Sequence, residues 1–403
     1  MQSILRRGSA LYAGLGPGVF TLAGFALLNA LSMSSNSFLS LYLTAHRHIE
    51  ASVVGQLISL RGLAAIVGAY IIGYVIDYGG PRKTLAAAYV LCAAGYLTLA
   101  TSGTAAVVGG ALVAVALART AFRPAYNVHL SSITAESDRG RAYSLFVMGL
   151  NGGSALASSI GGMIMSIVPA AVFMWDAALC LVAASVAVVL LRSQYPIPEQ
   201  KQAQVLEEKS QRGTRNEFLI LCALYFFIEI SESLSFFALP IRIVNELGYS
   251  PNIWGYMMAA LGISVFSLSL LASNYAKRHD QRWVIMISCI AMCLGLAVAG
   301  LASSSALLAL GWLAFCIAQV FVYPALMQRL LSTIGDNNKA RSISFYYSWS
   351  SVASTVGPLL AGWAISDQSA VRVPVFCALA AGVCGILGAL LLSSKHTSES
   401  VVT

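Results

Sequence analysis

The chain has 403 residues, of which 58% are hydrophobic and only 10% are charged, and its formal net charge is +8. Because a soluble domain is about 25% charged, this composition excludes a soluble enzyme, and the high hydrophobicity excludes a disordered chain. A basic chain could bind nucleic acid, but no basic cluster with interleaved aromatic residues occurs, so no nucleic-acid partner is expected.

Long apolar runs predict an all-α polytopic membrane protein that crosses the lipid bilayer with twelve transmembrane helices. A spanning helix needs about 20 apolar residues, and twelve helices of about 25 residues leave roughly 100 residues for loops and termini. In chain order, the predicted spans cover residues 17–43, 52–76, 83–102, 105–131, 140–168, 171–191, 216–244, 251–275, 283–301, 305–331, 340–366 and 371–393.

Basic residues are distributed unequally between the predicted loops. Most of them lie on one side of the membrane, whereas the loops of the other side contain only Arg47, Arg242 and Arg372. Loops rich in Lys and Arg stay in the cytoplasm. We therefore expect a multi-pass protein of a bacterial-type inner membrane, with both termini in the cytoplasm.

The longest polar stretch, residues 192–215, is predicted to be a cytoplasmic linker between two bundles of six helices, residues 1–191 and residues 216–403. The two halves align over a long distance at an offset of 200 residues. Parallel six-helix repeats are a transporter architecture. The matched pairs include Gly55 and Gly255, Gly62 and Gly262, Pro124 and Pro324, Arg141 and Arg341, Gly162 and Gly362, Asn29 and Glu229, and Arg119 and Gln319.

The sequence predicts neither a metal site nor an enzyme. Its eight cysteines lie in or beside apolar runs; Cys289 and Cys293 are one helical turn apart, but no His or acidic residue lies near them. This pattern is typical of small core residues rather than of disulfides or metal ligands. Metalloprotease and P-loop motifs are absent from the sequence, so we expect no metal, no cofactor and no enzymatic activity.

The segment GYVIDYGGPRK, residues 73–83, lies between the second and third predicted spans on the predicted cytoplasmic side. It resembles the motif G-x-x-x-D-x-x-G-x-[RK]-[RK] of the major facilitator superfamily. Together with the spans, the linker and the repeat, the resemblance covers essentially the whole chain. It implies two pseudo-symmetric six-helix bundles that act as a secondary transporter. Members of the family are usually monomers, so the resemblance also implies a monomer.

The resemblance also implies that this loop governs gating. An acidic residue at one helix end can face the positive N-terminus of another helix, and nearby bases would complete a cytoplasmic latch. The alternative is that the basic residues only hold the topology. The predicted gating residues are Gly73, Asp77, Gly80, Arg82, Lys83, Arg139 and Arg141.

Two other motifs of the family are incomplete in this chain. Arg119 resembles the arginine of the family's fourth-helix motif, but the glycine that usually follows is absent, because residues 121–124 read AFRP. Family exporters that exchange drugs for protons often have G-P-x-x-G-G in the fifth helix, where residues 157–162 read ASSIGG. A Gly-Pro pair occurs instead at Gly357 and Pro358. The direction of transport therefore stays open.

Five charged residues well inside predicted spans are candidates for function, because charges at membrane depth are costly and usually functional. A carboxyl group binds a proton more readily in a low-dielectric environment than in water. Glu229 or Glu232 is therefore the proton-coupling candidate, and the choice between them stays open. Some drug/proton antiporters of the family carry an acidic residue in the seventh helix, and Glu229 resembles that placement. The alternative is a structural ion pair with a buried arginine. The five residues are Arg61, Arg119, Arg123, Glu229 and Glu232.

Polar faces occur on the predicted spans whose counterparts line the central cavity in this superfamily. A guanidinium group prefers carboxylate or phosphate, so Arg61, Arg119 and Arg123 favour an anionic or zwitterionic substrate over a purely cationic one. The alternative is that Arg119 serves only packing or gating. The other predicted cavity residues are Asn29, Asn36, Tyr126, Tyr225, Gln319, Tyr323 and Trp349.

These features predict a proton-coupled secondary transporter that works by alternating access. We expect it to export a small amphiphilic, zwitterionic or anionic organic compound, similar to a drug or a metallophore. One alternative is proton-driven uptake of an anionic nutrient or siderophore. Another is a non-transporting sensor or a lipid scramblase on the same fold. The expected partners are a small-molecule substrate, protons and the lipid bilayer.

Overall fold

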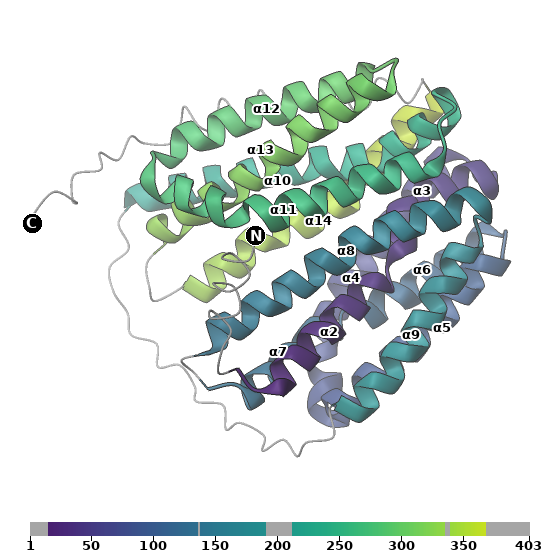
Figure 1. Cartoon of the computed structure of the whole chain (residues 1–403), viewed down its shortest axis with the longest axis horizontal. Coiled ribbons are helices and arrows are strands. Elements are labelled where there is room, and N and C mark those ends of the chain that lie inside the picture. The colour runs from purple at the N-terminus through teal and green to yellow at the C-terminus, as the bar shows by residue number, and fades with distance from the viewer. Residues whose placement is uncertain (1–14, 136–137, 191–211, 335–338, 368–403) are drawn as a thin grey trace, which may run out of the picture. The chain divides into compact units, whose positions relative to one another are not determined.

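The computed structural model describes residues 15–135, 138–190, 212–334 and 339–367. Within these ranges the chain is built from helices and contains no strand (Figure 1). Nine helical segments of this part are long and apolar enough to cross a membrane, in agreement with the predicted all-α polytopic membrane fold. The predicted twelfth span and residues 192–211 of the predicted linker lie outside the described residues.

The chain divides into two compact units. Unit 1 comprises the ranges 1–39 and 63–198, and unit 2 comprises the ranges 40–62 and 199–403. Up to residue 190 the helices are α2 (Pro17–Leu31), the 3-10 helix η1 (Ser34–Phe38), α3 (Leu39–Leu41), the π-helix η2 (Tyr42–His46), α4 (Ala51–Gly79), α5 (Pro81–Thr101), α6 (Ala105–Arg119), α7 (Phe122–Ile133), α8 (Arg139–Ile167) and α9 (Ala171–Leu190).

The remaining helices belong to unit 2. They are α10 (Arg212–Ile241), the π-helix η4 (Arg242–Glu246), α11 (Pro251–Arg278), α12 (Gln281–Leu301), α13 (Ser305–Thr333) and α14 (Lys339–Asp367). The last four residues of the predicted linker therefore form the start of α10. The predicted boundaries of the two bundles stay a prediction.

The first and the fourth predicted spans are each interrupted by two non-helical residues, at 32–33 and at 120–121. The first one changes from α2 to the tighter η1 and then, through α3, to the wider η2. The fourth one ends its first helix, α6, at Arg119 and resumes at Phe122. Pro124 lies in the first turn of α7, where its missing N–H removes no hydrogen bond of the helix. The break thus places Arg119 at the C-terminal end of α6.

The helix bounds confirm the repeat at an offset of 200 residues. Helices α5 and α12 cover residues 81–101 and 281–301, and the two π-helices cover residues 42–46 and 242–246. Each π-helix is followed by a residue in the left-handed region, His48 with φ 52° and Gly248 with φ 69°. Glycine adopts this conformation without steric cost, and histidine is one of the few other residues that tolerate it.

Small residues let neighbouring helices of each half approach closely. In unit 2, α12 packs beside α13 (Figure 1), and a Cβ atom added at Gly295 would lie 2.7 Å from the oxygen of Gly311 and 2.7 Å from the nitrogen of Phe315. The equivalent Gly95 of unit 1 lies in the same way against Ala111, whose oxygen would be 3.2 Å from an added Cβ.

We expect Gly295→Ala to lower the free energy of unfolding by about 1–3 kcal/mol, because an inserted methyl group in a packed interface forces the helices apart. Thermal unfolding of the purified protein in detergent measures this change. Gly110→Ala is the matched control, since no heavy atom lies within 4 Å of its added Cβ and alanine is the better helix former. Equal stability of Gly295→Ala and the wild type would contradict the close packing of α12 on α13.

Candidate functional site

Two acidic side chains of α10 share one face in unit 2. Glu229 and Glu232 are three residues apart, so they are neighbours on the helix surface. The hydroxyl of Tyr323 on α13 lies 2.8 Å from Oε1 of Glu229 and 2.9 Å from Oε2 of Glu232. The structure thus places both predicted proton-coupling residues beside Tyr323, which was predicted for the cavity.

Two neutral donors complete this acidic cluster, which we define as Glu229, Glu232, Gln319, Tyr323 and Ser350. The amide Nε2 of Gln319 donates to Oε2 of Glu232 at 2.5 Å, and the hydroxyl of Ser350 on α14 donates to Oε2 of Glu229 at 2.6 Å. Such donors stabilise the half-buried carboxyl oxygens of Glu229 and Glu232 without supplying a positive charge. Pairing of these glutamates with an arginine stays a prediction.

Aromatic rings surround the acidic cluster in unit 2. Tyr225 stacks on Tyr346 with ring centroids 4.2 Å apart and meets the ring of Tyr323 edge-on at 6.1 Å. Trp349 packs against Phe226 at 5.7 Å, and its buried Nε1 has no hydrogen-bond partner among the described residues. Aromatic faces with a polar donor nearby suit an amphiphilic ligand.

Arg119, at the end of α6, anchors a second polar cluster in unit 1. Its guanidinium donates to Oδ1 of Asn29 at 3.1 Å, to the hydroxyl of Ser32 at 3.0 Å, and to the backbone oxygen of Ser32. It also lies 3.3 Å from the hydroxyl of Tyr96 and 3.4 Å from the sulfur of Cys180. The guanidinium therefore ties α2, α5 and α9 to the end of α6.

Asp176 of α9 has a structural part in unit 1 that the sequence did not reveal. Its side chain is fully buried and accepts the backbone N–H groups of Ser34 at 2.9 Å and of Ser35 at 2.8 Å. A carboxylate at this place satisfies the free amides at the start of η1 and complements their partial positive charge. An acidic residue within an apolar run, 141 residues from Ser35, was the one signal in the sequence.

The two clusters occupy equivalent positions of the repeat. Asn29, Ser32 and Arg119 of unit 1 correspond to Glu229, Glu232 and Gln319 of unit 2. Arg119 donates to both Asn29 and Ser32, whereas Gln319 donates to Glu232. Unit 1 carries the charge on the donor, whereas unit 2 carries it on the acceptors. The same geometry therefore supports a fixed cation in one unit and two carboxyl groups in the other.

The remaining predicted cavity residues are spread along several elements. Arg123 on α7 and Asn36 on η1 are exposed, and Arg61 on α4 is half-buried. Tyr126 is buried, its ring centroid lies 4.2 Å from that of Phe146, and its hydroxyl has no hydrogen-bond partner among the described residues. The contacts of Arg119 described above join it to none of these four side chains.

The predicted gating residues lie at the junction of α4 and α5 and at the start of α8. Gly80 has a φ of 74°. This left-handed conformation favours glycine, which explains why the motif has a glycine at this position. Asp77 is exposed on α4, and Arg141 pairs with Asp138 at 3.0 Å. The side chain of Arg139 lies outside the described residues. The proposed latch between these residues stays a prediction.

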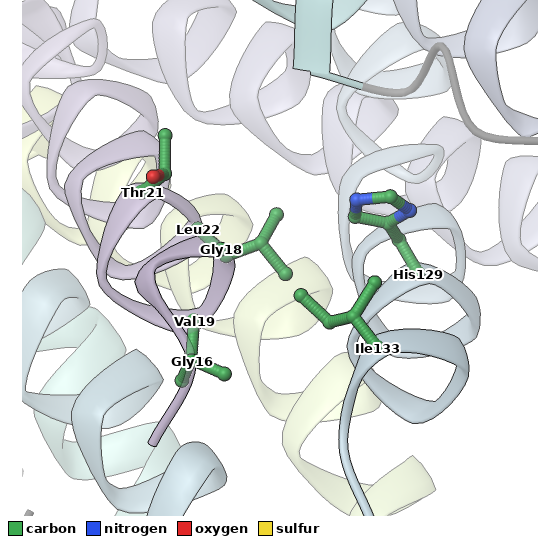
Figure 2. Close-up of a pocket in the computed structure, with 7 residues that line it drawn as sticks. All are labelled: Gly16, Gly18, Val19, Thr21, Leu22, His129 and Ile133. Atoms are coloured by element: carbon green, nitrogen blue, oxygen red, sulfur yellow. The ribbon is translucent and has the colours of Figure 1, made fainter. Parts of the chain in front are cut away.

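A pocket of about 250 Å³ lies between the start of α2 and the end of α7 in unit 1, as Figure 2 shows. The equivalent place in unit 2 contains a buried ion pair: Arg329 donates to Glu217 at 2.6 Å through Nε. At the matching positions unit 1 has His129 and Pro17, which fill less space. The lining residues are Gly16, Gly18, Val19, Thr21, Leu22, His129 and Ile133.

Comparison with known proteins gives a consistent result across the whole chain. A family model described as Major Facilitator Superfamily matches residues 20–228 and 221–402. The multidrug resistance protein MdtH of Edwardsiella ictaluri (strain 93-146) is 24% identical over 383 residues, which covers 91% of this chain and 92% of that protein.

Solved transporter structures share the fold. The nucleoside transporter NupG superposes with a TM-score of 0.74 at 14% identity and covers 94% of this chain and 100% of its own. A peptide transporter POT in complex with sulfate gives a TM-score of 0.75 at 14% identity, with coverage of 94% and 95%. A bacterial homologue of the human lysosomal transporter Spinster, inward-facing and unoccupied, gives 0.72 at 14% identity, with coverage of 94% and 98%.

Proposed function

The chain belongs to the major facilitator superfamily, and we propose that it is a proton-coupled exporter of a small amphiphilic, zwitterionic or anionic organic compound. It is a multi-pass membrane transporter, as the family and the shared fold indicate. The proposal concerns its energy source, its substrate and its direction.

The acidic cluster carries the proposal. Glu229 and Glu232 lie in an apolar helix and receive hydrogen bonds from Tyr323, Gln319 and Ser350, all of them neutral. A carboxyl group in such surroundings exchanges a proton with water only when water reaches it. This property is what a carrier needs to take up a proton on one side and release it on the other. The similarity to a multidrug resistance protein supports export.

Flux into vesicles with an imposed pH gradient tests this function. Ligands are first found by thermal shift on the purified protein, and the best of them is then followed in reconstituted vesicles. We expect the substrate to accumulate in the acidic compartment, because an antiporter moves it against the proton flow, and a protonophore should abolish the accumulation. Flux that ignores the gradient would contradict proton coupling, and absence of flux would point to a sensor.

The substrate's charge is tested at Arg119. If its guanidinium attracts substrate, Arg119→Ala should slow transport of anionic or zwitterionic probes about tenfold or more relative to cationic ones, because an ionic hydrogen bond contributes about 1.5–3 kcal/mol. The ratio between probes is the readout, since loss of folded protein lowers all rates equally. An unchanged ratio would assign Arg119 to packing alone, in line with its contacts to Asn29, Ser32 and Tyr96.

Proton-driven uptake of an anionic nutrient or siderophore is the second candidate. It is favoured by the loss of the exporter motif at residues 157–162. The same vesicles distinguish the two directions, because a symporter accumulates substrate in the alkaline compartment. A lipid scramblase would instead move labelled lipid between the leaflets with no gradient.

We also propose a bacterial inner-membrane location with both termini in the cytoplasm, a monomer as the working form, and a latch of Asp77 with Arg82, Lys83, Arg139 and Arg141. The excess of Lys and Arg in the loops on one side supports the orientation. The glycine conformation at Gly80 supports the motif that defines the latch.

A further inference from the structure

We propose that Glu229 and Glu232 share a single proton through the hydroxyl of Tyr323, which makes Tyr323 the bridge along which that proton moves. The inference rests on the proposed proton coupling and adds to it a stoichiometry and a route. It assigns Tyr323 to the proton path and treats the two glutamates as one site.

Tyr323 has fewer hydrogens to donate than the pair of carboxyl groups has oxygens within its reach. The oxygen of Tyr323 lies 2.8 Å from Oε1 of Glu229 and 2.9 Å from Oε2 of Glu232, so both separations are hydrogen-bond distances. A phenol has one hydrogen and can donate to only one of these oxygens, while an ionised carboxylate can only accept. A proton on one of the two carboxyl groups supplies the second hydrogen, and both contacts are then full hydrogen bonds.

The other two hydrogen-bond partners of the pair, Ser350 and Gln319, do not supply that proton. Ser350 donates its own hydroxyl hydrogen to Oε2 of Glu229, and Gln319 donates an amide hydrogen to Oε2 of Glu232. These bonds stabilise whichever carboxyl group is ionised, from either end of the chain of hydrogen bonds. The singly protonated pair therefore has a neutral donor at each carboxyl group, Ser350 at Glu229 and Gln319 at Glu232.

The transfer between the carboxyl groups needs no other reactant. When Glu229 is protonated, its O–H points to the Tyr323 oxygen, and the Tyr323 O–H points to Glu232. The O–H bond of Glu229 breaks and its proton forms a new bond to the Tyr323 oxygen. The original O–H bond of Tyr323 breaks at the same time, and that proton forms a bond to Oε2 of Glu232. The phenol stays neutral, and the net result is the movement of one proton and one charge.

Other titratable side chains near the pair are neutral in water at neutral pH. Tyr225 on α10 and Tyr346 on α14 lie near Glu229, and Cys316 on α13 lies near Glu232. Tyr347 of α14 lies against Tyr225, with ring centroids 6.0 Å apart. In water a phenol has a pKa of about 10 and a thiol a pKa of about 8.5, so changes of charge near pH 7 are assigned to the glutamates.

The first half of the chain lacks this arrangement. At the positions that match Glu229, Glu232 and Tyr323 it has Asn29, Ser32 and Arg123, none of which is an acid or a phenol. The bridge thus belongs to the second half alone and is not a general consequence of the repeat.

Infrared difference spectroscopy of the purified protein, titrated in H2O and in D2O, counts protonated carboxyl groups directly through their C=O band. We expect one such band from the pair near neutral pH and two well-separated titration steps. E229Q and E232Q should each leave one step, and the double variant should leave none, which assigns the signal.

Y323F is the decisive variant. Because the phenol stabilises the singly protonated pair more than the fully ionised or the fully protonated pair, its removal should bring the two steps closer by about one to two pH units, the size of one ionic hydrogen bond. Y256F removes an exposed phenol of the same unit and should leave both steps unchanged. A pair that is fully ionised or fully protonated near neutral pH would overturn the inference, as would a Y323F variant that leaves the separation of the steps unchanged.

This experiment is independent of flux. If the bridge is found but transport ignores the pH gradient, the proposed coupling fails and the shared proton stands. If transport follows the gradient while the two carboxyl groups titrate independently, the bridge alone fails.

Discussion

The double variant E229Q/E232Q is expected to lose proton-driven accumulation of substrate. With one proton exchanged per substrate, a gradient of one pH unit supports about tenfold accumulation, because both correspond to about 1.4 kcal/mol. Glutamine keeps the size of each side chain and can still accept hydrogen bonds from Tyr323 and Ser350, but it cannot carry a proton. The variant should therefore equilibrate its substrate to equal concentrations on the two sides.

Accumulation in reconstituted vesicles, compared at equal amounts of folded protein, measures this loss. E50Q is the matched control, because Glu50 is exposed in the segment between η2 and α4 and should transport as the wild type does. Accumulation by the double variant that still follows the pH gradient would place the proton-carrying group elsewhere in the chain.

Arg329→Met is expected to destabilise the protein by about 3–5 kcal/mol. Arg329 and Glu217 join α13 to α10 in a buried ion pair, with side chains only 3% and 10% exposed. Removal of one partner leaves the other as an uncompensated buried charge, which is much more costly than loss of the pair as a whole. The double variant E217M/R329M should recover most or all of the lost stability.

Thermal unfolding in detergent compares these variants. Arg141→Met is the matched control, since the Arg141–Asp138 pair is 38% and 32% exposed and such pairs contribute at most about 1 kcal/mol. If Arg329→Met unfolds at the wild-type temperature, or if the double variant is as unstable as the single one, the buried pair does not have the role assigned to it.

Local sequence was sufficient to predict the spanning helices and to identify the charged residues within them as candidate site residues. A spanning helix is determined by composition over about 20 residues, and the offset of 200 residues reappears in the structure down to the ends of α5 and α12. Glu229 and Glu232 could be recognised because charge is rare in an apolar run and because their spacing places them on one face.

The partners of these residues depend on tertiary contacts that no local pattern specifies. The hydroxyl of Ser350 reaches Glu229 across 121 positions of the chain, and Asp176 reaches Ser34 across 142. Hydropathy does not predict η1, because the backbone amides at its start are satisfied by the distant Asp176. The partner of Glu217 is equally distant, because Arg329 lies 112 positions away in the chain.

The proton stoichiometry of transport tests the central claim most directly. The logarithm of the substrate accumulation ratio is measured against the imposed pH difference, with the membrane potential clamped at zero and a neutral ligand from the thermal-shift screen. One shared proton on Glu229 and Glu232 predicts a tenfold change per pH unit, with substrate gathering in the acidic compartment. A wild-type protein whose accumulation ratio is independent of the pH difference would contradict the account.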